Sequence, residues 1–185
     1  SGPGAGMAQA AGPIIKNVQI LSRAGMSASA IWGYISTMVH AMDAMDTGGS
    51  GSSGGGSSGG SSSGQWENAN ESMSEYAAKY QQQITGRSDQ IYRLNGVKFD
   101  GFDGSKLLEA KGHYSWALKN GKWADWFHEG MDQILNQARN QINAARGLTI
   151  EWHCAERDVA EAMRKLLSEK GFSSIRVIYT PPAAP

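Results

Sequence analysis

Residues 48–64 contain only glycine and serine, in the order GGSGSSGGGSSGGSSSG. Glycine loses the most backbone entropy on ordering, and neither residue buries much apolar surface, so this run contributes nothing to a packed core. We expect a flexible linker between residues 7–47 and a domain spanning 65–185, which is long enough to fold around one core. Residues 1–6, SGPGAG, are typical of a cloning remnant before Met7 and are left out of the fold prediction.

The segment before the linker is predicted to be helical. Its apolar residues recur with helical spacing at Ile31, Ile35, Met38, Val39 and Met42. A break at 23–27 makes the whole segment a helical hairpin. Residues 24–42 carry no formal charge, but their glycine, serine, threonine and histidine content favours a helix buried against protein over stable membrane insertion.

The pattern after the linker alternates helices and strands. We expect helices at 71–84, 123–145 and 155–169, and strands at 90–94, 97–102, 106–111, 148–154 and 174–179. Asn95-Gly96 is a typical two-residue hairpin turn. An antiparallel hairpin set followed by helical crossovers predicts an α/β fold, with a mixed β-sheet flanked by helices.

Charge and cysteine content narrow the function classes. The full chain has 17 Lys and Arg against 17 Asp and Glu, and residues 65–185 are neutral as well, with 15 of each sign. Nucleic-acid binders usually show a basic excess, so neutrality weighs against that class, although a bound divalent cation would add positive charge. Cys154 is the single cysteine, which excludes an intrachain disulfide.

Charged residues occur in and beside two predicted strands. Glu109 and Lys111 are two apart and share one strand face, so Ala110 is expected to point to the opposite side, toward the core. The preceding hairpin brings Asp100, or its competitor Asp103, close to that pair. Two carboxylates with one ammonium suit a Mg²⁺ or Mn²⁺ site, whereas a surface ion pair is the simpler alternative.

This order of elements resembles the PD-(D/E)xK nuclease superfamily, which has the restriction-endonuclease fold. More narrowly, residues 66–182 resemble the restriction-endonuclease-like polymorphic toxins of the fifth Tox-REase family. The phrases that carry the resemblance are ITGR (84–87), GVKFDGF (96–102), LLEAKG (107–112), QARNQ (137–141) and IEWHCAE (150–156). No proline precedes Asp100, a position at which the superfamily pattern is loose.

The resemblance implies a set of site residues. It makes Asp100, Glu109 and Lys111 the metal-binding and catalytic core, with Asp100 preferred over Asp103 because it follows the apolar Phe99. The backbone carbonyl of Ala110 would also bind the metal. Further candidates are Gln137 and Gln141 on the following helix, Glu75 or Glu71 on the first helix, and His113 beside the strand.

Other conspicuous residues are predicted to be structural. His153 and Cys154 lack the partner spacing of a zinc site. The tryptophans are expected in the core rather than as stacking platforms for bases, namely Trp116, Trp123, Trp126 and Trp152.

The resulting hypothesis is a nuclease toxin that depends on Mg²⁺ or Mn²⁺ and cuts DNA. The resemblance further implies a secreted bacterial effector acting in the cytoplasm of a target cell. It implies delivery by type VI secretion. The partners it implies are a cognate immunity protein and a secretion-system or chaperone component. The alternatives are a ribonuclease of the same fold and a catalytically inactive binding module.

Overall fold

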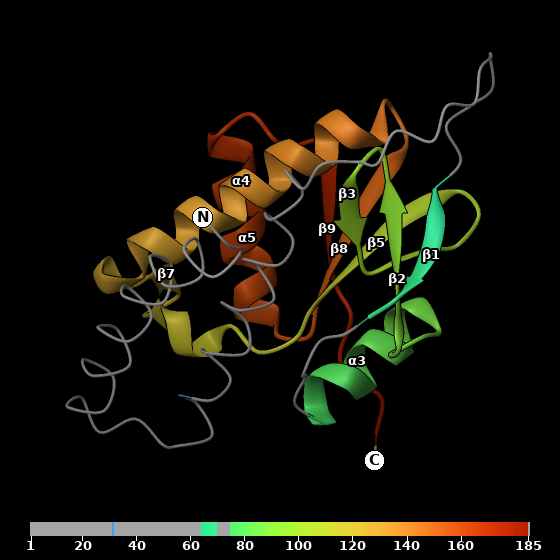
Figure 1. The fold of residues 1–185 in the computed structure, drawn as a ribbon. Coiled ribbons are helices and arrows are strands. Elements are labelled where there is room, and N and C mark those ends of the chain that lie inside the picture. Colours follow the sequence, from blue (N-terminus) through green and yellow to red (C-terminus); the bar gives the residue numbers. More distant parts are fainter. Residues whose placement is uncertain (1–30, 32–63, 70–74, 185) are drawn as a thin grey trace, which may run out of the picture.

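The computed structural model describes residue 31, residues 64–69 and residues 75–184 (Figure 1). Its elements follow in the order β1 (Gln65–Asn68), α3 (Glu75–Thr85), β2 (Gln90–Leu94), β3 (Val97–Phe99), β4 (Gly101–Phe102), β5 (Lys106–Lys111), η1 (Ser115–Ala117), β6 (Leu118–Lys119), β7 (Lys122–Trp123), η2 (Asp125–Phe127), α4 (His128–Ala145), β8 (Thr149–Cys154), α5 (Arg157–Glu169) and β9 (Ile175–Tyr179), where η marks a short 3₁₀ helix.

The central sheet has four strands in the order β4-β5-β8-β9. β4 pairs with β5 in antiparallel orientation, whereas the β5–β8 and β8–β9 pairs are parallel. A second, antiparallel sheet has the order β1-β2-β3. The predicted α/β fold with a mixed sheet is therefore confirmed.

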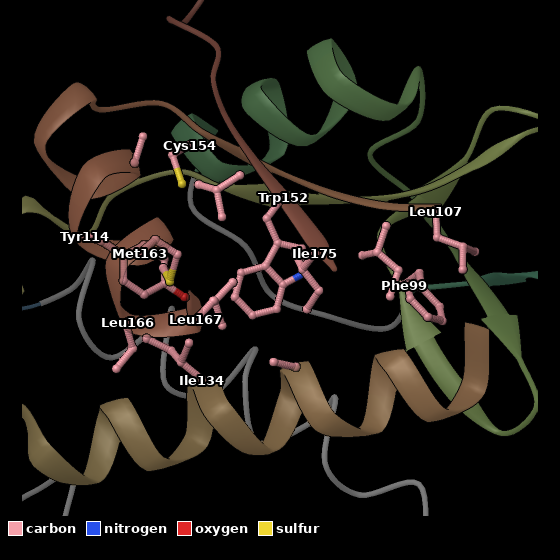
Figure 2. Packing of buried hydrophobic residues seen from close by; sticks show 14 of the residues in the cluster. Phe99, Leu107, Tyr114, Ile134, Trp152, Cys154, Met163, Leu166, Leu167 and Ile175 are labelled. Atoms are coloured by element: carbon pink, nitrogen blue, oxygen red, sulfur yellow. The ribbon is translucent and has the colours of Figure 1, made fainter. Parts of the chain in front are cut away.

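Helices lie on both faces of the four-stranded sheet. α4 and α5 pack on one face and α3 on the other, as Figure 2 shows with the strands between α3 and α4. The main core fills the α4 side, where Phe127, Trp152 and Met163 are completely buried. On the α3 side, a Cβ added at Gly112, directly after β5, would lie 3.3 Å from the ring of Tyr76.

Two predicted elements differ from the observed ones. The strand expected at 97–102 is interrupted at Asp100, so that β3 pairs with β2 and β4 pairs with β5. The helix expected from Trp123 begins only at His128, because Asn120 and Gly121 adopt positive φ angles and form the turn of a β6–β7 hairpin. β1 was not predicted.

The predicted N-terminal helical hairpin and the Gly/Ser linker lie outside the described residues, apart from Ile31 and Gly64. Ile31 is in a helical conformation and packs, partly buried, against the core. Within the described residues, no helix combines the length and the apolar character needed to cross a membrane.

Candidate active site

β5 presents Glu109 and Lys111 to the α4 side of the sheet. Their side chains are 1% and 2% exposed. In the parallel register with β8, Glu109 lies beside Trp152 and Lys111 beside Cys154, and both neighbours belong to the core. The prediction that Ala110 points to this core is wrong, because α4 and α5 cover the face that carries Glu109 and Lys111.

Asp100 lies at the bend between β3, which pairs with β2, and β4, which pairs with β5. Its Oδ2 accepts a hydrogen bond from the backbone N–H of Ala110 at 2.8 Å. Its own N–H donates to Oε1 of Glu109 at 3.2 Å. Asp100 is therefore held beside Glu109, and it is 1% exposed.

Gly101 allows this bend to lie close to α3. A Cβ at Gly101 would be 2.6 Å from the Cβ of Thr85, the last residue of α3, which is closer than real Cβ atoms approach. The glycine that follows Asp100 thus lets β4 pack against the end of the helix.

Asp103 has a structural role, because its carboxylate closes the turn between β4 and β5. Oδ1 accepts hydrogen bonds from the backbone N–H of Ser105 at 2.9 Å and of Lys106 at 2.7 Å. Its side chain is 38% exposed and lies 3.5 Å from the Lys106 ammonium. Between the two candidates, the structure brings Asp100 to Glu109 and leaves Asp103 at the turn.

Two glutamines of α4 reach the same carboxylate. Gln141 Nε2 donates to Oε1 of Glu109 at 2.9 Å, and Gln137 Nε2 donates to Oε2 at 3.2 Å. The carbonyl oxygen of Gln137 accepts a hydrogen bond from the Lys111 ammonium. The helical spacing of four residues therefore places both amides over one carboxylate, and both are buried.

Lys111 is charged although it is buried. Burial alone lowers the pKa of the ammonium, but the Tyr114 phenol oxygen and the carboxylates of Glu109 and Asp100 together outweigh burial and raise the pKa above its ordinary value. Burial raises the pKa of Tyr114, so this phenol is neutral at neutral pH. The two carboxylates therefore keep Lys111 protonated, with Glu109 Oε2 3.7 Å from Nζ.

Two further candidates are not brought to this cluster. Glu75 is 83% exposed and forms an ion pair with Lys79 at 3.1 Å. His113 is 52% exposed and stacks on Tyr76, with ring centroids 4.0 Å apart. Glu71 lies outside the described residues.

Trp152 belongs to the core, as predicted, but its contacts with the site were not predicted. Its indole N–H donates to Oε1 of Gln141 at 2.8 Å, and its ring centroid is 4.5 Å from the Lys111 ammonium. The register that places Trp152 beside Glu109 is a parallel pairing between distant strands. No local sequence signal reports that pairing.

The donor set fits a hard divalent cation. The carboxylates of Asp100 and Glu109 are hard oxygen ligands on adjacent backbone segments. No cluster of three or more His, Cys, Asp or Glu side chains suited to a metal occurs among residues 64–69 and 75–184. Mg²⁺ commonly binds through one or two carboxylates and keeps several waters, so two carboxylates suffice for it.

A mixed sheet between helices, with Asp100 beside the Glu109–Lys111 strand, defines a restriction-endonuclease-like fold. Residues 77–157 match the family described as Tox-REase-5, restriction endonuclease fold toxin 5. This match supports a restriction-endonuclease-like toxin domain, and with it the nuclease class. A comparison with curated proteins found no match.

Proposed function

We propose that residues 65–185 form a nuclease toxin domain that requires Mg²⁺ or Mn²⁺ and cuts DNA. The observation that supports this most strongly is the buried cluster of Asp100, Glu109, Lys111 and Gln137, which lie on β5, on the bend beside it and on α4. The family match supports the nuclease class, and the cluster supports the assignment of residues.

In this proposal, Asp100 and Glu109 hold the cation, together with the backbone carbonyl of Ala110. The cation would supply Lewis acidity toward the phosphodiester and make water more acidic. Lys111, held protonated by the two carboxylates, stabilises negative charge that develops on the phosphate. Gln137 links Lys111 to Glu109 and keeps the ammonium oriented.

The experiment that tests this function is plasmid cleavage in the presence of Mg²⁺. We expect Glu109→Gln and Lys111→Met to reduce the cleavage rate by at least about 100-fold, because each removes a charge from the site. Asp103→Asn is the matched control, since the new amide oxygen can still close the turn. It should cut at the rate of the parent.

Cleavage by both Glu109→Gln and Lys111→Met at the parental rate would contradict the assignment. Because a buried charge left without its partner destabilises a protein, circular dichroism must first show that each variant is folded. Total RNA incubated beside the plasmid separates the two substrates. Degradation of RNA alone would replace the deoxyribonuclease by a ribonuclease of the same fold.

The burial of the site residues favours a second candidate function, that of a catalytically inactive binding module. Asp100, Glu109 and Lys111 are 1–2% exposed, and both oxygens of Glu109 already accept hydrogen bonds from glutamine amides. A phosphodiester cannot reach such a site unless the surrounding chain moves. Calorimetry with Mn²⁺ distinguishes the two candidates, because the inactive module would bind no Mn²⁺.

The proposed setting is that of a secreted antibacterial effector, delivered by type VI secretion and neutralised by an immunity protein. The match to a toxin family supports it. Expression in the cytoplasm of a sensitive bacterium should stop growth and degrade its DNA, whereas Glu109→Gln should do neither.

A further inference from the structure

Trp152 is a large aromatic residue in contact with the candidate site, and its side chain is completely buried. It lies on β8 directly beside Glu109 of β5. Its side chain points from the sheet toward α4, the helix that carries Gln137 and Gln141 (Figure 2). Trp152 is thus placed between the charged strand and the two glutamines.

The indole of Trp152 dictates the orientation of the Gln141 amide. An indole N–H can only donate a hydrogen bond, so the atom of Gln141 that faces it at 2.8 Å must be the carbonyl oxygen. The NH₂ group must then face Oε1 of Glu109, which accepts at 2.9 Å. Rotating the amide by half a turn would set donor against donor at Trp152 and acceptor against acceptor at Glu109.

The ring of Trp152 also contacts Lys111. The Lys111 ammonium lies 4.5 Å from the ring centroid, within the range of a cation–π interaction. The same ammonium donates to Gln137 and lies 3.7 Å from Glu109. One side chain therefore contacts both Lys111 and the glutamine that orients Glu109.

We propose that Trp152 is a positioning residue that holds Glu109 in the orientation required for a divalent cation, acting through Gln141. This inference rests on the proposed metal-dependent function. Residues that orient metal ligands through hydrogen bonds typically change metal affinity by about 10–100-fold when they are replaced. Trp152 has this relation to Glu109, with Gln141 as the intermediate.

The test is a double-mutant cycle in the full chain, read by Mn²⁺ calorimetry as well as by plasmid cleavage. Trp152→Phe keeps an aromatic ring but removes the N–H donor, and Gln141→Leu removes the amide. Each should weaken Mn²⁺ binding by about tenfold. The Mn²⁺ affinity of the double variant should equal that of the single variant with the lower affinity, because both changes break the same chain of hydrogen bonds.

Phe127→Leu is the matched control for packing. Phe127 is completely buried in the same core and makes no hydrogen bond to the site through its apolar ring. This variant should be less stable to urea but should bind Mn²⁺ as the parent does. A loss of Mn²⁺ affinity as large as that of Trp152→Phe would show a general effect of core packing and overturn the proposal.

Parental Mn²⁺ affinity in Trp152→Phe, or losses that multiply in the double variant, would overturn this inference alone. Absence of Mn²⁺ binding by the parent would overturn the proposed function together with it.

If Trp152→Phe does not fold, NMR spectroscopy of the parent protein tests the positioning role of Trp152 instead. During a Mg²⁺ titration, the indole N–H resonance of Trp152 should shift. The midpoint of this shift should equal the midpoint of Mg²⁺ binding measured by calorimetry. An unchanged resonance would contradict the proposal.

Discussion

Asp100 and Asp103 are the same residue type, three positions apart, yet their environments are opposite. Asp100 is 1% exposed and accepts a hydrogen bond from Ala110, while the Asp103 side chain is 38% exposed and closes a turn. Partial burial acts to raise the pKa of Asp103, but hydrogen bonds from Ser105 and Lys106 outweigh it and lower the pKa below the ordinary value of 3.8. Asp103 therefore contributes to stability as an anion.

At the residue scale, we predict that this contribution depends on pH. Because the folded-state pKa is lowered, the stabilisation is fully present above the unfolded-state value and is lost as pH falls through the folded-state pKa. Asp103→Asn should be less stable than the parent at about pH 6 and equally stable once the carboxyl is protonated in both states. Urea unfolding at several pH values measures the difference. A difference that does not shrink below pH 3.8 would contradict the prediction.

At the scale of elements, the Asn95-Gly96 turn joins β2 to β3 and also contacts α4. Asn95 and Gly96 have φ angles of 51° and 81°, the left-handed region that a tight hairpin turn requires. The side-chain amide of Asn95 donates to the carbonyl oxygen of Ala144, near the end of α4, at 2.7 Å. The turn thus connects the hairpin to the helix that carries the two site glutamines.

Two substitutions at this turn separate its two roles. Asn95→Gly tolerates the positive φ angle but removes the hydrogen bond to Ala144, and it should reduce the free energy of unfolding by about 1 kcal/mol. Asn95→Ala loses the hydrogen bond and also strains the backbone, adding about 1 kcal/mol. Chemical denaturation measures both values. Equal stability of the two variants would show that backbone conformation at residue 95 is unimportant.

At the scale of the whole molecule, one core unites most of the elements that follow the linker. Its buried residues come from β2, β3, β5, α4, β8, α5 and β9, together with the connections between β5 and α4. Ile31 is the described residue before the linker that packs against this core. The described part of the chain after Gly64 therefore contains a contiguous core of its own.

We predict that a polypeptide of residues 64–185 folds independently. It should unfold in one cooperative transition, and loss of the partly buried Ile31 contact should reduce its stability by about 1 kcal/mol. Urea unfolding of this polypeptide beside the full chain checks both statements. A shortened chain without a cooperative transition would show that residues 1–63 are needed for folding.

Local patterns predicted most of the secondary structure. Period-two and period-3.6 apolar spacing, together with the Asn95-Gly96 turn, identified β2, β5, β8, β9 and the greater part of α3, α4 and α5. The short β6–β7 hairpin was missed because two-residue strands carry no periodicity. The break at Asp100 was missed because a change of pairing partner leaves the local pattern unaltered.

The sequence by itself determined which residue types could form a cation site and that Glu109 and Lys111 share one face of a strand. Only the tertiary structure decided that this face is covered by α4, that Asp100 rather than Asp103 lies beside Glu109, and that Trp152 contacts the site. The physical reason is that strand periodicity assigns residues to two faces, whereas the packing of distant helices and strands decides which face is buried and what lies against it.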